Sequence, residues 1–327
     1  MEGDQKPLAL QLCPFSPAME AEIGARFVIE RWFERNEGEQ ADWLAENGAR
    51  VRAVVTGGHI GCPSPLMEAL PELAIIAING VGFDKVDLTL ASARGVAVTT
   101  TPGVLTDDVA DLAIGLVVAL LRRIPAADVH VRKGLWPKGD MALARKVSGK
   151  RFGVLGLGQI GMAIARRLEA FGPVAYCDAA PKSVDYAYHA DPAALAAASD
   201  VLVVACAATP ATQGLVDAGV LEALGADGYL VNVARGSVID ERALTRAVEE
   251  GVIAGAALDV FAREPHVPDA LIASERTVLT PHVASGTVET RQAMADLVVA
   301  NLDDFLAGSA PRTALPEIVE IGHHQVR

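Results

Sequence analysis

The stretch 154–168, VLGLGQIGMAIARRL, decides the fold class because it joins a strand-like run to a helix-like run through a glycine-rich turn. Gly156, Gly158 and Gly161 give this turn the pattern G-x-G-x-x-G. In such a turn the first glycine makes the bend, the second lets a pyrophosphate approach the backbone, and the third lets helix and strand pack closely. The first amides of the following helix favour a negative charge. The stretch therefore predicts a strand, turn and helix that bind a dinucleotide.

Short runs of aliphatic and β-branched residues alternate with stretches rich in Ala, Leu, Glu and Arg on both sides of this turn. That alternation is typical of βαβ units with a parallel sheet. Most of the strand-like runs are apolar throughout, which predicts strands covered by helices on both faces. The expected strands are residues 8–12, 52–57, 73–79, 96–100, 152–157, 174–177, 201–207, 229–234, 254–260 and 277–280. The predicted fold class is α/β.

The chain has 327 residues, more than one core usually serves, which favours two domains. Residues 104–124 are apolar at helical spacing, with acidic residues early and Arg122 and Arg123 late, and this pattern predicts one long helix. Residues 124–140 are too irregular for a core and are expected on the surface or against another subunit. We therefore predict a first part over 1–101, a dinucleotide-binding domain over 102–286 that includes the long helix, and a return to the first part over 287–327.

The composition argues against several kinds of partner. The chain carries 28 basic and 41 acidic side chains, and its formal charge of −13 disfavours nucleic acid. No apolar run reaches the roughly eighteen residues of a membrane span, and the N-terminus lacks a signal pattern. We expect a cytoplasmic protein whose partners are small molecules and a second copy of itself.

The cysteines are Cys13, Cys62, Cys177 and Cys206. They show no CxxC spacing, which favours a reducing compartment and predicts no metal site. Cys177 and Cys206 lie in strand-like runs, where a thiol is usually an apolar filler, whereas Cys62 lies in a Gly/Pro loop and is the one to test for reactivity. The C-terminal pair His323 and His324 is expected on a solvated surface.

Asp178 ends the second strand-like run of the dinucleotide domain, seventeen residues after Gly161. An acid near this position would accept hydrogen bonds from the adenosine ribose of NAD; the other interpretation is a helix cap or a solvated turn acid. Ala179 and Ala180 supply no cation for the 2′-phosphate of NADP, and Lys182 is the only nearby positive charge. We therefore expect NAD(H) to be preferred, with NADP(H) as the alternative.

Three further strand-like runs are followed by polar side chains, and ligands bind at that edge of open α/β sheets. Arg235 could hold a carboxylate with its planar fork. His282 could exchange a proton, because the reference pKa of histidine is near neutrality, and Glu264 could be its carboxylate partner. Asp259 ends a strand-like run five residues before Glu264. One such residue alone is more often a surface or capping residue, but together they suit hydride transfer to a 2-keto acid.

The motifs resemble the D-isomer-specific 2-hydroxyacid dehydrogenase family, especially its hydroxypyruvate, glyoxylate and hydroxyphenylpyruvate reductase branch. The resemblance rests on NGVGFDKVDL (79–88), TPGVLTDDVADLAIGLVVALLRR (101–123), GLGQIGMAIARRL (156–168), VNVARGSVIDERAL (231–244), AALDVFAREP (256–265) and LTPHVASGTVETR (279–291). It implies a Rossmann-like NAD(P)-binding domain inserted into a flavodoxin-like substrate domain, and a homodimer. It also implies reduction of small 2-keto acids to D-2-hydroxy acids, with glyoxylate and hydroxypyruvate first and aryl pyruvates or sugar-derived keto acids as alternatives.

The resemblance assigns roles to individual residues. It implies a catalytic set of Arg235, Glu264 and His282, with Asp259 beside the nicotinamide amide. The substrate residues that it implies are Thr56, Gly57, Gly58, Gly80, Val81, Gly82, Trp136 and Arg235. The cofactor residues that it implies are Gly156, Gly158, Gln159, Ile160, Gly161, Asp178, Thr106, Cys206, Thr212, Val233, Ala234, Asp259 and Ser285.

The chain departs from the branch at two places. Many relatives have Ser-Arg for NADPH where this chain has Asp178 and Ala179, and many have proline at Ala207. Trp136 has two interpretations, a side chain that reaches the partner's active site or one that only fills a dimer contact. Two other functions stay open: an NAD-sensing interaction protein on the same fold, and oxidation of formate or phosphite, for which the sequence has no distinct signal.

Overall fold

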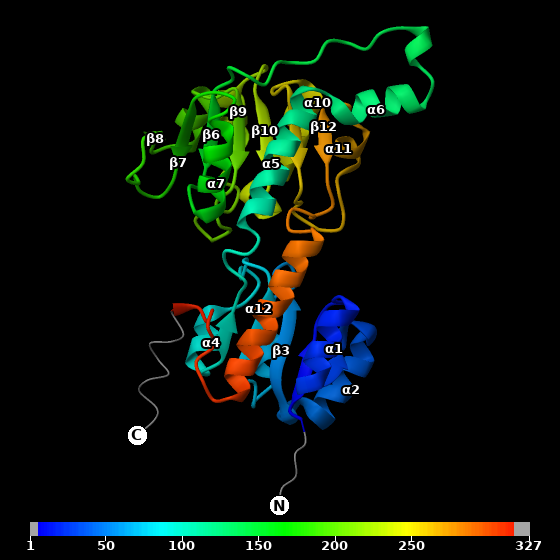
Figure 1. The fold of residues 1–327 in the computed structure, drawn as a ribbon, viewed down its shortest axis with the longest axis vertical. Coiled ribbons are helices and arrows are strands. Elements are labelled where there is room, and N and C mark those ends of the chain that lie inside the picture. Colours follow the sequence, from blue (N-terminus) through cyan, green and yellow to red (C-terminus); the bar gives the residue numbers. More distant parts are fainter. Residues whose placement is uncertain (1–5, 317–327) are drawn as a thin grey trace, which may run out of the picture. The chain divides into compact units, whose positions relative to one another are not determined.

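The computed structural model describes residues 6–316, and its chain forms two compact units (Figure 1). Unit 1 combines the residues up to Leu105 with those from Thr287 onward, and unit 2 is Thr106–Gly286. The first boundary lies after Leu105, four residues later than the boundary after residue 101 that the sequence predicted. The end of the expected return segment, with His323 and His324, lies outside the described residues.

Unit 1 contains a five-stranded parallel sheet in the order β2-β1-β3-β4-β5. Its strands are β1 (Leu8–Gln11), β2 (Val28–Arg31), β3 (Val51–Gly57), β4 (Ile75–Asn79) and β5 (Ala97–Thr99). This order is that of flavodoxin-like sheets. Strand β2 was not predicted, because it is a short edge strand that buries none of its residues and has no apolar run.

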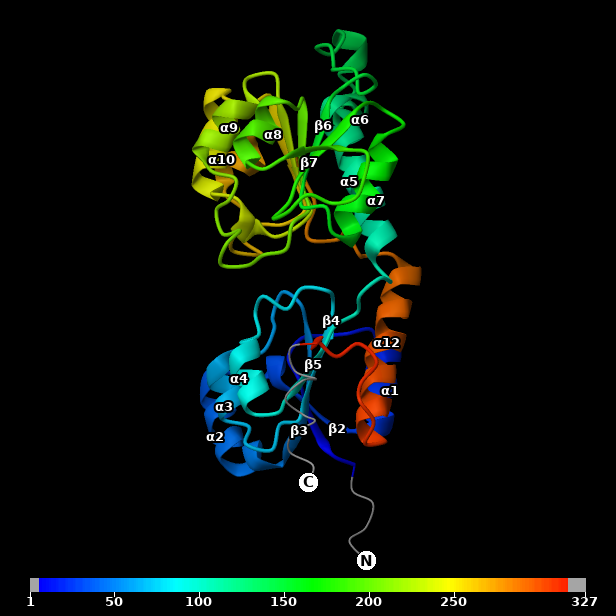
Figure 2. The ribbon, with the colours of Figure 1, turned by 90° about the vertical axis from the view of Figure 1, so that its left-hand side faces the viewer.

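Helices cover both faces of this sheet (Figure 2). One face carries α2 (Glu37–Asn47), α3 (Ser64–Glu68) and α4 (Leu88–Ala93), and the other carries α1 (Pro17–Arg26) and α12 (Val288–Leu306). The two faces bury separate apolar clusters, one around Met67 and Ile76 and one around Ile23 and Val298. The C-terminal helix α12 thus completes a sheet that the N-terminal residues begin, which is why both chain ends belong to unit 1.

Unit 2 contains a seven-stranded parallel sheet in the order β12-β11-β10-β9-β6-β7-β8. Its strands are β6 (Phe152–Leu155), β7 (Val174–Cys177), β8 (Ala187–His189), β9 (Val201–Val204), β10 (Tyr229–Asn232), β11 (Gly255–Leu258) and β12 (Thr277–Leu279). This is the Rossmann order with one additional strand, and the order reverses between β6 and β9. The predicted α/β class is confirmed, and β8 was missed because its three residues form a partly exposed edge.

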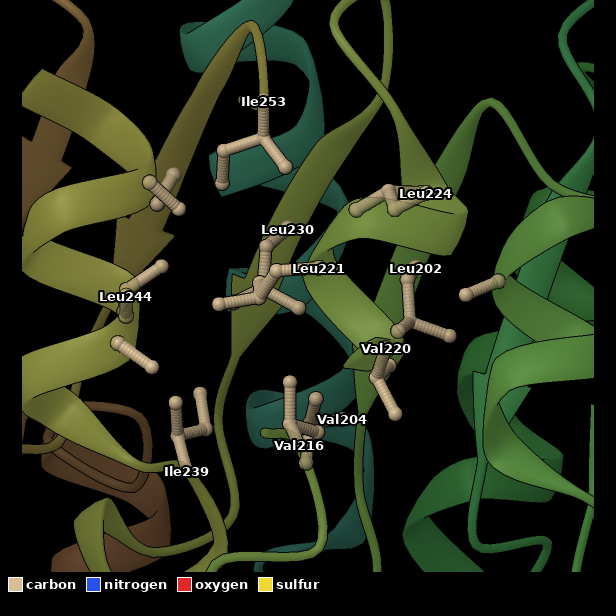
Figure 3. Packing of buried hydrophobic residues seen from close by; sticks show 14 of the residues in the cluster. Leu202, Val204, Val216, Val220, Leu221, Leu224, Leu230, Ile239, Leu244 and Ile253 are labelled. Carbon is tan, nitrogen blue, oxygen red and sulfur yellow. The ribbon is translucent and has the colours of Figure 1, made fainter. Parts of the chain in front are cut away.

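The core of unit 2 lies between its sheet and the helices on each face. Figure 2 shows α5 (Thr106–Leu121) and α7 (Gln159–Leu168) on one face, with α8 (Pro192–Ala197), α9 (Ala218–Leu224) and α10 (Glu241–Glu250) on the other. Leu202 and Leu230 from the strands meet Leu221 from α9 and Leu244 from α10 (Figure 3). The helix α11 (Asp269–Ala273) precedes β12.

The expected single helix over 104–124 is wrong at its C-terminal end. Helix α5 ends at Leu121, Arg123 has a left-handed backbone with φ 54°, and α6 (Ile124–Arg132) begins a new helix. Pro125 explains the break, because proline lacks the amide that a continuing helix needs and its ring clashes with the preceding turn. Figure 1 shows α6 and the chain after it extending away from the sheet of unit 2. Of the helices that the structure describes, none combines the length and hydropathy needed to cross a bilayer.

Candidate active site

The glycine turn lies at the point where the sheet of unit 2 reverses its strand order, between β6 and α7. Gly156 has a φ of +92°, and a side chain there would overlap Cys206. A Cβ at Gly161 would overlap the Gly156 carbonyl. A Cβ at Gly158, by contrast, would meet no atom within 4 Å among the described residues, apart from its neighbours along the chain. The first and third glycines are thus required by the protein itself, while the second leaves an open cradle at the start of α7, where Gln159 is the first residue. This arrangement fits a dinucleotide pyrophosphate.

Asp178 lies directly beside this turn, one residue after β7. Its Oδ2 accepts a hydrogen bond from the Leu157 amide at 2.8 Å, and its Oδ1 accepts one from the Ala179 amide at 2.7 Å. The Lys182 ammonium lies 3.1 Å from Oδ2. Burial opposes ionisation, but these hydrogen bonds and the lysine charge hold the pKa of the Asp178 carboxyl below its usual value. Asp178 is therefore an ionised acceptor at the turn, and its contact with a ribose stays a prediction.

His282 and Glu264 form the central contact of the site. The Nδ1 of His282 lies 2.8 Å from Oε2 of Glu264, and Oε1 of Glu264 accepts a hydrogen bond from the Phe261 amide at 3.0 Å. Burial of Glu264 opposes its ionisation, yet the His282 and Phe261 hydrogen bonds, aided by the charge of Arg235, lower the pKa of this carboxyl. The structure therefore brings the three predicted catalytic side chains into one electrostatic environment.

A buried asparagine fixes the backbone that carries Arg235. Asn232 ends β10, and its side-chain amide donates to the Arg235 carbonyl at 3.0 Å while its oxygen accepts from the Ala234 amide at 3.0 Å. The next residue, Gly236, packs so closely on the backbone of Phe261 that any side chain there would overlap it. This close packing places the loop after β10 against the loop that leads to Glu264.

Asp259 holds the loop that carries His282. Its carboxylate is fully buried; Oδ1 accepts from the Thr280 hydroxyl at 2.6 Å and the Val283 amide at 2.9 Å, and Oδ2 accepts from the Ala284 amide at 3.0 Å. The Asp259 carbonyl also accepts the His282 amide at 2.8 Å. His282 has a φ of +53°, an uncommon conformation for a residue with a side chain, and these hydrogen bonds maintain it. A contact between Asp259 and a nicotinamide amide stays a prediction.

The other predicted cofactor residues also lie in unit 2: Thr106 begins α5, Ile160 is in the first turn of α7, and the rest lie on loops after strands. Six of them are half-buried, namely Thr106, Ile160, Cys206, Thr212, Ala234 and Ser285, while Val233 is buried. Thr212 closes its own loop, since its hydroxyl donates to the Ala207 carbonyl at 2.7 Å. Their contacts with a cofactor stay predictions.

The predicted substrate loops meet in unit 1, at the carboxyl ends of the neighbouring strands β3 and β4. A Cβ at Gly80 would lie 3.3 Å from the Gly58 amide nitrogen, so the two loops are adjacent. The Thr56 hydroxyl donates to the Gly61 carbonyl at 2.7 Å, and the Thr101 amide donates to the Gly80 carbonyl at 2.8 Å. The backbones of both loops, 56–58 and 80–82, are thereby held in place, whereas the Thr56 side chain is buried.

Cys62, the cysteine to test for reactivity, has a buried thiol. Burial raises its pKa to about 12, which disfavours the reactive thiolate. The loop is drawn into the interior because Cys62 pairs with Val86 and its amide donates to the Lys85 carbonyl. The strand expected over 201–207 ends at Val204, so Cys206 follows β9 instead of lying in it, and burial raises its pKa to about 11. Within residues 6–316, no group of three or more His, Cys, Asp or Glu side chains could hold a metal ion.

Sequence reasoning missed the supporting residues. Asn232 and Thr280 each lie within three residues of a predicted catalytic side chain. Their position at the end of a strand is the sequence signal that could have identified them. The ion pair of Lys182 with Asp178 was also missed, because the sequence does not show that the lysine turns back toward the carboxylate.

Known proteins resemble this chain over most of its length. Residues 114–284 match the D-isomer specific 2-hydroxyacid dehydrogenase, NAD binding domain. The hydroxyphenylpyruvate reductase of Plectranthus scutellarioides is 48% identical over 301 residues, which are 91% of this chain and 96% of that protein. The 2-ketogluconate reductase of Gluconobacter oxydans is 43% identical over 300 residues, 91% of this chain and 94% of that protein.

A solved structure is similar in fold as well. The NADPH-dependent glyoxylate/hydroxypyruvate reductase from Sinorhizobium meliloti, in complex with NADP and malonate, has a TM-score of 0.89 and 42% identity, covering 96% of this chain and 98% of that one. The chain therefore belongs to the D-isomer-specific 2-hydroxyacid dehydrogenase family. The resemblance inferred from the motifs is confirmed, and an enzyme that uses a nicotinamide cofactor is favoured over a sensing protein.

Proposed function

We propose that this chain reduces small 2-keto acids, glyoxylate and hydroxypyruvate first, to D-2-hydroxy acids with a reduced nicotinamide cofactor. The observation that carries the proposal is the 2.8 Å contact between His282 Nδ1 and Glu264, in the same unit as Arg235 and the glycine turn. When bound, the cofactor supplies the hydride. Glu264 engages Nδ1 of the imidazole, so the proton for the substrate oxygen is exchanged at Nε2.

The remaining residues bind and orient the substrate in this proposal. The guanidinium of Arg235 takes the substrate carboxylate, because its fork matches two oxygens at once. The loops 56–58 and 80–82 of unit 1 keep the role that the family resemblance implies for them, which is to offer backbone amides to a carboxylate. The names of the relatives support a keto acid substrate, and they range from glyoxylate and hydroxypyruvate to hydroxyphenylpyruvate and 2-ketogluconate.

A panel of 2-keto acids tests the proposal. Initial rates are measured with glyoxylate, hydroxypyruvate, hydroxyphenylpyruvate and 2-ketogluconate, each with NADH and with NADPH, on the wild type and on His282→Gln. We expect turnover above about 1 s⁻¹ with the first two acids. An enzyme that reduces none of the four, although it binds coenzyme, refutes the proposal and favours a sensing role.

NADH is the preferred coenzyme in this proposal. The ionised Asp178 carboxylate suits the ribose hydroxyls of NADH, and Ala179 and Ala180 beside it supply no cation for a 2′-phosphate. Comparison of kcat/KM for the two coenzymes is the test, and a clear preference for NADPH contradicts it.

We also propose a homodimer formed through α6 and the chain after it. Large apolar side chains are exposed along this arm, with Trp136 65% and Leu143 97% accessible, and such patches mark contact surfaces. Light scattering should give the dimer mass for the wild type and a monomer for Leu143→Asp. Leu306→Asp, at an exposed site in unit 1, is the control and should remain dimeric.

Trp136→Ala separates the two interpretations of that tryptophan. A raised KM in a dimer of normal mass indicates that the side chain reaches the partner's active site, and an unchanged KM indicates a contact filler. A cytoplasmic location, which the scattered cysteines favour, belongs to the same proposal and is checked by cell fractionation.

A further inference from the structure

The loop from Asp178 to Lys182 is a built structure rather than a loose turn. The buried Tyr176 hydroxyl accepts a hydrogen bond from the Lys182 amide at 2.7 Å, and the Tyr188 hydroxyl donates to the Asp178 carbonyl at 3.3 Å. The two tyrosine rings lie 5.3 Å apart and belong to the neighbouring strands β7 and β8. These contacts hold the backbone of Lys182 where its ammonium lies 3.1 Å from the Asp178 carboxylate.

The lysine changes the charge at this edge of the site. Asp178 alone would present a full negative charge beside the glycine turn, where it would repel an added phosphate group. Paired with Lys182, the same position has no net charge, and the lysine side chain remains 38% exposed. An exposed ammonium on a flexible stem can leave the carboxylate and contact a phosphate instead.

We propose that Lys182 is a specificity residue for the coenzyme: it offsets the charge of Asp178 and contacts the 2′-phosphate, so that the chain accepts NADPH beside its preferred NADH. The inference rests on the proposed function, because it needs the dinucleotide at the glycine turn. It assigns a phosphate contact to a residue four positions after the acid.

Equilibrium binding tests the inference without turnover. Dissociation constants of NADH and NADPH are measured by fluorescence for the wild type, Lys182→Ala and Lys182→Arg, and competition with ADP and 2′,5′-ADP isolates the 2′-phosphate. In Lys182→Ala we expect the Kd of NADPH and of 2′,5′-ADP to rise about tenfold and that of NADH to change less than about twofold. Lys182→Arg should restore NADPH binding. The NADPH affinity of the wild type should fall more steeply with added salt than that of Lys182→Ala.

Lys150→Ala is the matched control. It removes the same charge from the same unit, but Lys150 precedes β6 and so lies at the opposite end of the sheet from the glycine turn. Its NADPH affinity should stay within about twofold of the wild type.

Three results would overturn the inference. The first is an equal loss of affinity for both coenzymes in Lys182→Ala, which makes the lysine only a support for its loop. The second is an unchanged NADPH affinity in that variant, and the third is a wild type that binds NADH but not NADPH. The third leaves the proposed function standing, whereas a wild type that binds neither coenzyme overturns both.

Discussion

We expect Asp259→Asn, which replaces one carboxylate oxygen by an amide nitrogen, to lower both stability and kcat. In Asp259→Asn the side chain keeps its size, and one oxygen can still accept from Thr280 and Val283. The new NH₂ group then faces the Ala284 amide, which currently donates to Oδ2 at 3.0 Å, so two donors oppose each other in a buried site. The variant therefore loses a hydrogen bond to a charged acceptor and leaves a buried amide without one.

The magnitude follows from these two losses. A hydrogen bond to a charged group contributes about 1.5–3 kcal/mol, and an unsatisfied buried donor costs about 1–3 kcal/mol, while removal of a buried charge offsets part of both. We expect unit 2 to lose about 2–4 kcal/mol, which for a domain of its size lowers Tm by roughly 4–16 °C. Because the loop carries His282, we also expect kcat to fall about a hundredfold.

Calorimetry, kcat with glyoxylate and the Kd of NADH measure the three consequences separately. Asp200→Asn is the control: Asp200 pairs with Arg151 at the amino end of the sheet, so we expect a loss of about 1 kcal/mol or less and a normal kcat. An Asp259→Asn variant with unchanged Tm and kcat refutes the reasoning. A variant with unchanged Tm but weaker NADH binding indicates instead that Asp259 contacts the cofactor.

Three further predictions concern the same unit. His282→Gln should lower kcat by about 10²–10⁴ and leave the Kd of NADH within about twofold, and near-normal turnover in a folded variant contradicts its role as acid and base. Gly161→Ala should destabilise unit 2 by at least about 1–3 kcal/mol because its Cβ overlaps the Gly156 carbonyl, whereas Gly158→Ala should fold normally and bind NADH weakly; equal melting temperatures would exclude this difference. The pKa of Glu264 is lowered in the folded protein, so the ionised side chain contributes to the free energy of unfolding above the usual value of 4.5. This contribution is lost as the pH falls through the lowered pKa. The Tm difference between wild type and Glu264→Gln should therefore be constant above about pH 5 and shrink below it.

Local patterns determined the fold class and the candidate residues. Apolar runs between helical stretches indicated parallel strands, and the glycines at 156, 158 and 161 indicated a turn for a phosphate, because backbone conformation at such a turn depends on residues next to one another. The same holds for His282 and Arg235, which could be recognised from their place directly after a strand. Short edge strands such as β2 and β8 carry no such pattern, since their pairing depends on neighbours far along the chain.

The tertiary structure alone decided how the candidate side chains are held. Glu264 contacts His282 across eighteen positions, and Asp259 reaches residues more than twenty positions ahead, because adjacent parallel strands bring their carboxyl ends together. Burial of Cys62 and the pairing of Lys182 with Asp178 likewise depend on how loops fold back. A sequence shows which groups can ionise or donate, but distance and burial decide which of them interact, and these arise only when separate strands pack side by side.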